Sequence, residues 1–317
     1  MKNSGIHYTG VDFDRAATLR KDQDWVDKQF QNPKCLFIPI WQNKNLVTGQ
    51  NDTSDPGIIY LSKGQYSGFE KLVSESVFLG FDDDRPIFAL DISGIKEEIL
   101  KTHFNQGEFI NLRLIGQLLK ARDAARLAYA RGIIHWHNTH QFCSKCGSKS
   151  INKSGGHLRL CSNMECGKET FPRTDPAVIM LVEYRLESGE KKCLLGRHTK
   201  SPEGMFSTLA GFVDPGESLE EAVVREVFEE AGIRVGQVTY QGSQPWPFPA
   251  SIMLGFRAQA ETININVDPQ ELAEAKWFSA DELINAGEWG DKNPGLKISR
   301  KDSIARHLID SWINEQL

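Results

Sequence analysis

The sequence of 317 residues lacks any apolar run long enough to cross a bilayer, and positive charge is not in excess. It has 37 lysines and arginines against 42 aspartates and glutamates, which gives a formal net charge of −5. This balance excludes a global positive field that gathers nucleic acid, while a local basic pocket stays open. The first twenty residues also lack the apolar centre of a secretory signal. We therefore expect a cytoplasmic protein without a membrane partner.

Cysteine is scarce, and its six residues are unevenly spread. Cys35 and Cys193 stand alone inside apolar segments. The remaining four fall in one short, turn-rich stretch: Cys143, Cys146, Cys161 and Cys166. Two such pairs in a reducing compartment indicate a metal site rather than a disulfide framework. Four thiolates suit a closed, structural Zn²⁺ site, with iron as a lesser alternative for the same ligands.

The chain divides into three segments that differ in pattern. Residues 1–137 contain both strand and helix patterns and predict a small α/β domain. Residues 138–172 carry the cysteine pairs, have almost no core of their own, and predict a zinc ribbon that needs its metal to fold. Residues 173–317 combine strands with a central helix and predict an α/β/α sandwich. The fold class expected for the whole chain is therefore α/β (α+β).

The expected elements follow from short apolar runs and from helical spacing. In the first segment we expect strands at 36–40, 77–81 and 86–90, the last two as a hairpin, and a helix over 112–130. In the third segment we expect strands at 177–182, 193–195 and 252–260, with helices over 218–231 and 304–313.

The helix expected over 218–231 has clear signals at both ends. Ser218 followed by Glu221 forms a capping box, which predicts that the helix begins there. Gly232 is placed to end the helix in the left-handed conformation. The stretch between these two ends is rich in glutamate.

Three of these glutamates, Glu226, Glu229 and Glu230, are spaced three and four apart and share one face. Like charges beside an apolar face cost free energy unless cations compensate them. Their hard oxygen atoms suit Mg²⁺ or Mn²⁺, and Mg²⁺ commonly bridges to the phosphates of a substrate. A solvated acidic helix face is the ordinary alternative, and charge spacing alone does not decide between the two.

A longer pattern contains these glutamates. Residues 211–233 match Gly-x5-Glu-x7-Arg-Glu-apolar-x-Glu-Glu-x-Gly-apolar at every fixed position, and in this the chain resembles the Nudix hydrolases. The resemblance implies metal-dependent cleavage of a nucleoside diphosphate linkage. It implies that the Mg²⁺ or Mn²⁺ ligands are the backbone carbonyl of Ala210 and the carboxylates of Glu226, Glu229, Glu230 and Glu271. It also implies a supporting ion pair between Arg225 and Glu217.

Two roles stay open at this point. Glu274 lies close to Glu271 in the sequence and competes for the last ligand position, although it is more typical of a surface carboxylate. Either Glu229 or Glu230 can act as the general base that takes a proton from the attacking water. Bound metal ions would neutralise the phosphates and lower the pKa of that water.

A second run, Ser-Gln-Pro-Trp-Pro-Phe-Pro-Ala-Ser at residues 243–251, follows the helix at a short distance. Its three alternating prolines predict a stiff, extended loop that carries two aromatic rings, and a rigid packing loop is the plain alternative. The run resembles the marker of the NADH pyrophosphatases within the Nudix family, which also join an N-terminal Nudix-like α/β domain, a zinc ribbon and a Nudix domain. The resemblance implies substrate contacts at Phe171, Phe212, Gln244, Pro245, Trp246, Pro247, Phe248, Pro249, Ala250, Ser251 and Ala305.

Two positions depart from that family's usual pattern. Tyrosine is common where this chain has Phe171, so a flat ring is kept and a hydroxyl hydrogen bond is lost. The second cysteine pair has a gap of four residues, where a gap of two is also common. Neither departure removes a ligand type that the predicted sites need.

The resemblance implies hydrolysis of NADH, and less readily of NAD⁺, to a nicotinamide mononucleotide and AMP by a homodimer. The same cut on an RNA 5′ end would remove an NAD cap. Another Nudix substrate, such as ADP-ribose, a dinucleoside polyphosphate or FAD, is one alternative. A nucleotide-sensing Nudix-fold regulatory module is a non-enzyme alternative, but such a module is expected to lose glutamates of the pattern, and all four are present. A zinc-ribbon nucleic-acid module with an accessory Nudix domain is a third.

Overall fold

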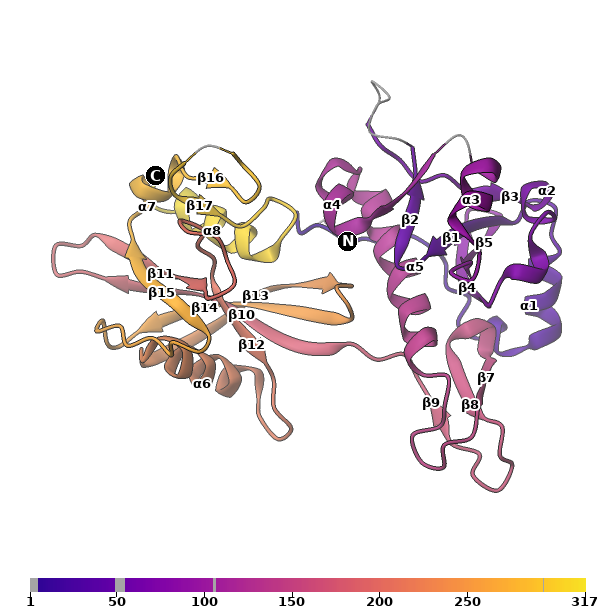
Figure 1. Ribbon diagram of the computed structural model, residues 1–317. Coiled ribbons are helices and arrows are strands. Elements are labelled where there is room, and N and C mark those ends of the chain that lie inside the picture. The colour runs from indigo at the N-terminus through magenta and orange to yellow at the C-terminus, as the bar shows by residue number, and fades with distance from the viewer. Residues whose placement is uncertain (1–4, 49–54, 105–106, 293) are drawn as a thin grey trace. The chain divides into compact units, whose positions relative to one another are not determined.

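The computed structural model describes residues 5–48, 55–104, 107–292 and 294–317 and divides the chain into two compact units (Figure 1). The N-terminal unit comprises Gly10–Thr174 and Pro247–Ala250. The C-terminal unit comprises Met1–Thr9, Asp175–Trp246 and Ser251–Leu317. The cysteine-rich segment belongs to the N-terminal unit, and the three-domain division expected from the sequence stays a prediction. Among the described residues, no helix combines the length and the apolarity that a membrane crossing needs.

The N-terminal unit is built on one mixed sheet. Its described strands are β1 (Leu36–Trp41), β2 (Lys44–Val47), β3 (Leu61–Ser62), β4 (Glu75–Asp82), β5 (Arg85–Asp91) and β6 (Glu108–Asn111). They run in the order β4-β5-β1-β2-β6, and β3 pairs with β1. β1 and β5 are parallel, whereas β4 and β5 form the expected antiparallel hairpin. Asp83 takes a φ of 55° in the turn of this hairpin, a conformation that aspartate adopts more readily than most residues.

Strand alternation divides the apolar side chains of this sheet between two faces. On one face, Phe37, Phe78 and Phe88 pack with Val26 of α1 (Gln23–Phe30). The helices α2 (Lys63–Tyr66) and α3 (Glu97–His103) also contribute side chains to this core. The other face is covered by α5 (Ala121–Thr139), which contacts β1, β4 and β5 (Figure 1).

The single helix expected over 112–130 is wrong. The chain forms the short helix α4 (Leu112–Ile115) and a 3-10 turn, and it is extended at Leu119 with a ψ of 149°. Helix α5 then begins at Ala121 and continues to Thr139. Its second half buries polar residues, including Arg131 and His137, which interrupt the apolar spacing. The apolar pattern therefore could not show where the helix begins and ends.

The cysteine-rich segment forms a small antiparallel sheet from β7 (Ser150–Lys153), β8 (Leu158–Cys161) and β9 (Glu169–Thr170). We call residues 138–174, with this sheet, the ribbon. Its two cysteine pairs lie in tight turns. Gly147 and Gly167 follow the pairs with φ values of 74° and 54°, which glycine adopts without a steric cost.

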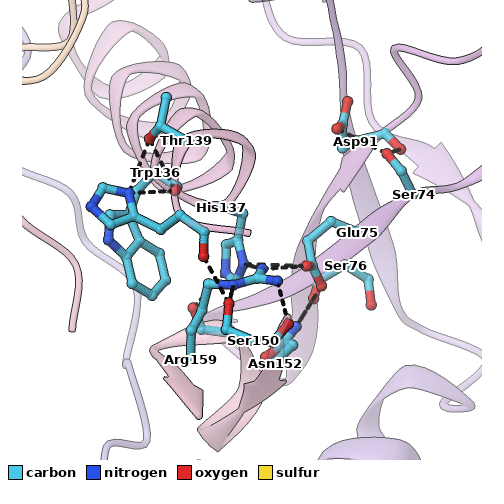
Figure 2. A network of polar contacts seen from close by, with 12 residues as sticks. Ser74, Glu75, Ser76, Asp91, Trp136, His137, Thr139, Ser150, Asn152 and Arg159 are labelled. Atoms are coloured by element: carbon cyan, nitrogen blue, oxygen red, sulfur yellow. Dashed lines mark hydrogen bonds and ion pairs between the residues drawn. The ribbon is translucent and has the colours of Figure 1, made fainter. Parts of the chain in front are cut away.

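A buried polar network joins the ribbon to the large sheet of the same unit (Figure 2). Arg159 Nη1 of β8 donates to Glu75 Oε2 at the start of β4, at 2.9 Å. Asn152 Nδ2 of β7 donates to Glu75 Oε1 at 2.7 Å and to the carbonyl of Ser76 at 3.0 Å. His137 Nδ1 of α5 lies 3.2 Å from Glu75 Oε2 and 2.7 Å from Arg159 Nη1. These contacts connect three separate stretches of the chain.

The C-terminal unit is built on a second mixed sheet. Its described strands are β10 (Asp175–Arg185), β11 (Lys191–His198), β12 (Leu209–Phe212), β13 (Val235–Trp246), β14 (Ser251–Ala260) and β15 (Leu272–Phe278). They run in the order β13-β14-β10-β11-β15, with β12 paired to β10. The central strands β10 and β14 are parallel. The short strands β16 (Gly287–Glu288) and β17 (Lys297–Ile298) form a separate pair.

Helices cover both faces of this second sheet. On one face, Val227 of α6 (Leu219–Ala231) shares a core with Val178 of β10. On the other face, Trp312 of α8 (Ile304–Asn314) shares a core with Ile179 of β10 and with a residue of α7 (Ala280–Ile284), Leu283. Successive residues of one strand therefore enter two different cores, and the expected α/β/α arrangement is confirmed.

Most of the expected elements are confirmed, and with them the α/β fold class. The confirmed strands are 36–40, 77–81, 86–90, 177–182, 193–195 and 252–260, which correspond to β1, β4, β5, β10, β11 and β14. The confirmed helices are 218–231 and 304–313, which correspond to α6 and α8.

The polar network of the ribbon makes a prediction about pH. Burial by itself raises the pKa of Glu75, but hydrogen bonds from His137, Asn152 and Arg159 outweigh burial and lower the pKa from its ordinary 4.5 to about 2. A lowered pKa stabilises the fold above pH 4.5, and this stabilisation is lost as the pH falls toward 2. We expect Glu75→Gln to lower the free energy of unfolding by about 3 kcal/mol near neutral pH.

This loss should shrink steadily as urea unfolding is repeated at lower pH. The control is Glu70→Gln, because Glu70 is an exposed glutamate of the same unit. A loss for Glu75→Gln that does not depend on pH would contradict the ionised network.

Candidate active site and metal centres

Helix α6 begins and ends where its sequence signals predict. The hydroxyl of Ser218 accepts a hydrogen bond from the Glu221 amide at 3.2 Å, and the Glu221 carboxylate accepts one from the Ser218 amide at 2.7 Å. Gly232 follows the helix with a φ of 68°, and its amide donates to the Phe228 carbonyl at 2.8 Å. These caps hold the glutamates of α6 at defined positions along the helix.

Arg225 organises the charges around α6. Its Nε donates to Glu217 Oε1 at 2.6 Å and its Nη2 donates to Glu217 Oε2 at 2.9 Å, so the expected ion pair is present and bidentate. The same Nη2 donates to the Phe212 carbonyl at 2.8 Å. The hydrogen bonds from Arg225 lower the pKa of Glu217 to about 2. Glu217 therefore keeps its charge, and the guanidinium is tied to the loop before the helix.

The other edge of this guanidinium faces two expected metal ligands. Arg225 Nη1 donates to Glu226 Oε1 and to Glu229 Oε2, both at 2.9 Å. Glu226 is buried, whereas Glu229 is exposed. Arg225 thus sets the direction of both carboxylates without burying Glu229.

Glu230 is the least compensated carboxylate of the cluster. It is 5% exposed, and its Oε1 is buried without a hydrogen-bond partner in the described structure. Burial raises its pKa to about 8, and the charges of Glu226 and Glu271 add to the rise. A hydrogen bond from the backbone of Ala210 acts in the opposite direction. A bound cation would relieve both the repulsion and the unpaired oxygen.

Close packing places Glu226 against the strand before the helix. Burial is the main cause that raises the pKa of Glu226. Hydrogen bonds from Arg225 lower this pKa in part, and the charges of Glu229 and Glu271 raise it further. A Cβ atom added to Gly211 of β12 would lie 1.8 Å from the Glu226 carboxyl carbon. Only glycine leaves room for this carboxylate beside the backbone that follows Ala210.

The structure distinguishes the two candidates for the last carboxylate. The charge of Glu271 raises the pKa of both Glu226 and Glu230. Glu274, on β15, pairs instead with Lys276 and with Arg197, whose Nε lies 3.6 Å from its Oε2. Hydrogen bonds from Lys276 lower the pKa of Glu274. Glu271 is therefore the candidate that shares the electrostatics of α6.

The remaining expected substrate contacts differ in exposure. Phe212, at the end of β12, is 60% exposed, and Phe171, which follows β9, is 54% exposed. Phe212 belongs to the C-terminal unit and Phe171 to the N-terminal unit. Ala305 of α8 is 4% exposed, and its side chain belongs to the core that this helix shares with the sheet.

The proline-aromatic run is extended, as expected, but most of it is strand rather than loop. Pro245 and Trp246 end β13 and pair with Ile252 and Ser251 of β14. Only Pro247–Ala250 form the turn between the two strands, and this turn belongs to the N-terminal unit. A run of prolines predicts extended backbone, and only the partner strand shows that this backbone is paired.

Gln244 has a structural duty that its sequence motif does not reveal. Its side chain is fully buried, and its Nε2 donates to the carbonyls of His7 at 3.1 Å and Asp302 at 2.8 Å. Its Oε1 accepts from the amide of Ile304 at 2.8 Å. Tyr8, which like His7 belongs to the C-terminal unit, donates to Asp302 Oδ2 at 2.9 Å. The side-chain amide of Gln244 thus joins β13 to the segment around His7 and to the start of α8.

The turn Pro247–Ala250 is held by arginines of the N-terminal unit. Arg131 of α5 donates through Nη1 to the carbonyl of Pro247. The ring centre of Phe248 lies 5.0 Å from the guanidinium of Arg131 and 5.7 Å from that of Arg113. Neither these arginines nor the segment around Tyr8 carries a local sequence signal, because their partners are more than a hundred residues away along the chain.

The four cysteines of the ribbon converge on one point. Cys143 Sγ lies 3.8 Å from Cys166 Sγ, and Cys146 Sγ lies 3.4 Å from Cys161 Sγ. All four sulfur atoms lie within 4.8 Å of one another. A tetrahedron with metal–sulfur bonds of about 2.3 Å has edges of roughly 3.8 Å, so this cluster fits one tetrahedral metal ion. The longer gap between Cys161 and Cys166 does not separate their sulfurs from the others.

Known families match both halves of the chain. Residues 175–297 match the NUDIX domain family, and residues 34–136 match the family described as NADH pyrophosphatase-like rudimentary NUDIX domain. The NAD-capped RNA hydrolase of Schizosaccharomyces pombe is 33% identical over 358 residues, which cover 98% of this chain and 94% of that protein. The NAD-capped RNA hydrolase NUDT12 of Homo sapiens is 32% identical over 334 residues, which cover 95% of this chain and 71% of that protein. Nudix hydrolase 19, chloroplastic, of Arabidopsis thaliana is 39% identical over 306 residues, which cover 83% of this chain and 66% of that protein.

The contacts of Gln244 predict a large loss of stability on its replacement. Gln244→Leu keeps an apolar side chain of similar length but leaves two carbonyls and one amide buried without partners. We expect the free energy of unfolding to fall by roughly 3 kcal/mol, because each unpaired buried group costs about 1–3 kcal/mol. Thermal unfolding of the variant and of Gln241→Leu, an exposed glutamine of the same strand, measures the difference. Equal melting temperatures for the two variants would show that these hydrogen bonds do not stabilise the unit.

Proposed function

Because the chain belongs to the Nudix hydrolase family, we propose that it hydrolyses the pyrophosphate bond of NADH, and less readily of NAD⁺. The products are a nicotinamide mononucleotide and AMP, and the same cut removes NAD caps from RNA 5′ ends. The observation that carries the proposal is the buried carboxylate of Glu230, whose Oε1 has no hydrogen-bond partner in the described structure and whose pKa is raised by burial and by the charges of Glu226 and Glu271. Two relatives named as NAD-capped RNA hydrolases that align along nearly this whole chain support the choice of substrate.

The acidic cluster fits Mg²⁺ or Mn²⁺, because its donors are carboxylates and one backbone carbonyl. The proposed ligands are the carbonyl of Ala210 and the carboxylates of Glu226, Glu229, Glu230 and Glu271. The ion, when bound, neutralises phosphate charge and lowers the pKa of water. The hydrogen bond of Ala210 to Glu230 supports the pairing of strand and helix in one site.

The residues of the chain divide the remaining work among them. Arg225 is held by Glu217 and directs Glu226 and Glu229, so we assign this ion pair to positioning. Glu229 and Glu230 are both candidates for the base that takes the proton from water. Glu229 is exposed and bound to Arg225, whereas Glu230 is buried and carries the unpaired oxygen.

The aromatic rings and the proline run are proposed to bind the dinucleotide. Phe212 is exposed directly after the strand that carries Ala210, which supports a role in stacking on a base. Phe171 offers a second exposed ring. In the run, Pro245, Trp246, Pro249, Ala250 and Ser251 are at least partly exposed, whereas Gln244 and Pro247 are buried. We assign Gln244 and Ala305 to shaping the site from beneath.

Two further properties belong to the proposal. The resemblance to NADH pyrophosphatases supports a homodimer. A cluster of four cysteines that binds a metal persists in reducing surroundings, which supports a cytoplasmic location.

The metal of the ribbon is proposed to be Zn²⁺. We expect the purified protein to contain one zinc ion per chain by elemental analysis and to lose it in Cys161→Ser, because three thiolates hold zinc less tightly than four. The protein should become easier to unfold as the zinc is lost, since a segment this small depends on its metal. Cys35→Ser is the control, as Cys35 is a buried cysteine outside the ribbon. An unchanged zinc content in Cys161→Ser would contradict the four-cysteine site.

The hydrolase proposal is tested by incubating the protein with NADH and Mg²⁺ or Mn²⁺ and separating the products by chromatography. We expect reduced nicotinamide mononucleotide and AMP in equal amounts. Glu230→Gln should lower kcat by about 10²–10⁴-fold, the contribution typical of a positioned acid–base group. Glu220→Gln, an exposed glutamate of the same helix, should retain the activity.

The other outcomes separate the alternatives. Cleavage of ADP-ribose, FAD or a dinucleoside polyphosphate without cleavage of NADH would keep the hydrolase and overturn the substrate. Nucleotide binding without turnover of any of these would favour a sensor. The full cluster of carboxylates on α6 speaks for turnover, because a sensor has no need of them.

A further inference from the structure

The ribbon differs in charge from the rest of the chain. Residues 138–172 contain five lysines and arginines and two glutamates, for a net charge of +3, within a chain of net charge −5. A metal ion held by four thiolates carries a charge of −2, which offsets part of this excess. Arg173, near the end of the ribbon, adds a further positive charge. Positive charge is therefore concentrated on the ribbon of an otherwise acidic protein.

The strand β7 separates the ribbon into two faces. Exposure alternates along it: Lys149, Ile151 and Lys153 are exposed, whereas Ser150 and Asn152 are half-buried. Side chains two residues apart lie on the same side of a strand, so the two lysines flank Ile151 on one surface. We call this the outer face of the ribbon.

The inner face of β7 is occupied by the network around Glu75. Asn152 is paired across the sheet with Arg159 of β8, and both donate to Glu75 (Figure 2). Arg159 also donates to the hydroxyl and the carbonyl of Ser150, at 2.8 Å and 2.9 Å. Since the inner face is fixed to the large sheet of the same unit, the outer face is turned away from that sheet.

An aromatic ring accompanies the lysines on the outer face. Phe142 forms a bridge opposite Lys149, which puts both side chains on the same side, and it is 60% exposed. Leu160, opposite Ile151, is itself opposite Glu169 of β9. A second exposed ring, Phe171, follows β9 and is 54% exposed.

Exposed rings beside lysines are the elements of a surface for single-stranded nucleic acid. The rings stack on bases of any sequence, and the lysines follow the phosphates. A second copy of this chain carries a net charge of only −5 over 317 residues, so it offers a lower density of negative charge to the lysines. An RNA chain carries one negative charge for each nucleotide and matches them.

We propose that the outer face of the ribbon, formed by Phe142, Lys149, Ile151 and Lys153, binds the RNA chain whose NAD cap is cleaved. This inference rests on the proposed function and assigns a second duty to the ribbon beside holding its metal. The face selects NAD joined to RNA over NAD alone, because only the capped RNA reaches the lysines. Binding is independent of sequence, since neither stacking nor phosphate contacts read the bases.

The test compares two substrates on the full-length protein: NADH, and a single-stranded RNA of about 20 nucleotides with a 5′ NAD cap, longer than a site of roughly 4–16 nucleotides. Lys149→Gln/Lys153→Gln should lower kcat/KM for the capped RNA by roughly 3- to 30-fold, as expected for two exposed charge contacts. It should leave kcat/KM for NADH unchanged. The slope of log(kcat/KM) against log salt should become shallower by about 1.4, at roughly 0.7 for each lost phosphate contact.

Matched controls isolate the outer face. Lys28→Gln/Lys71→Gln removes the same charge from exposed lysines elsewhere in the N-terminal unit and should leave both substrates unaffected. Phe142→Ser should lower kcat/KM for the capped RNA without changing the slope of log(kcat/KM) against log salt, because a ring contributes stacking rather than charge. Zinc content and melting temperature should match the unmodified protein in each variant.

A binding measurement without divalent metal separates this inference from the proposed function. Failure to cleave NADH would overturn the proposed function, while weaker binding of the same capped RNA by Lys149→Gln/Lys153→Gln alone would still support the outer face. Equal binding and equal kinetics in both double variants would overturn the inference. A change of the double variant's sedimentation from dimer to monomer would also overturn it, because the outer face would then be a contact between copies.

Discussion

The repulsion among carboxylates gathered around α6 is the constraint on which the candidate site depends. Glu226 and Glu230 are buried, and their pKa values are raised by burial and by the charges of neighbouring glutamates. One guanidinium, that of Arg225, compensates part of this charge and holds Glu217, Glu226 and Glu229 in place. It does not reach the unpaired oxygen of Glu230. The fold therefore holds an electrostatic imbalance at α6 that the proposed divalent cation would relieve.

Two buried polar clusters, one around Gln244 and one around Glu75, join segments that are distant in the sequence. The side chain of Gln244 satisfies two carbonyls and one amide from distant stretches of the C-terminal unit. Glu75 receives hydrogen bonds from Arg159 and Asn152 in the N-terminal unit. Buried polar groups are costly when one partner is missing, so each cluster specifies one arrangement of the segments it joins. The first defines the strand that carries the proline run, and the second defines which face of the ribbon is exposed.

The two faces of the ribbon sheet differ in what they contact. The ribbon cysteines need only tight turns and a small sheet, which leaves one face of that sheet uncommitted. Side chains of the inner face bind Glu75, and the outer face carries the exposed side chains of Lys149, Lys153 and Phe142. The net charge of the whole chain does not predict this surface, because it sums the charges of surfaces that face different partners.

Local chemistry in the sequence determined the position of α6, the spacing of its glutamates and the grouping of the four ribbon cysteines into one cluster. Capping boxes, terminal glycines and short gaps between ligands act within a few residues, so their effect is the same wherever the segment lies in the fold. The alternating apolar runs likewise determined most strands of both sheets.

Only the tertiary structure decided the break before α5, the pairing of the proline run as a strand, and the commitment of Gln244 to buried hydrogen bonds. It also decided that Tyr8 donates a hydrogen bond to Asp302, 294 residues away in the sequence, and that Ala305 is buried. In each case the partner is remote in sequence, and a buried polar residue looks the same as an exposed one until its partner is known. The free energy of such a contact depends on both residues, whereas a local sequence pattern contains only one of them.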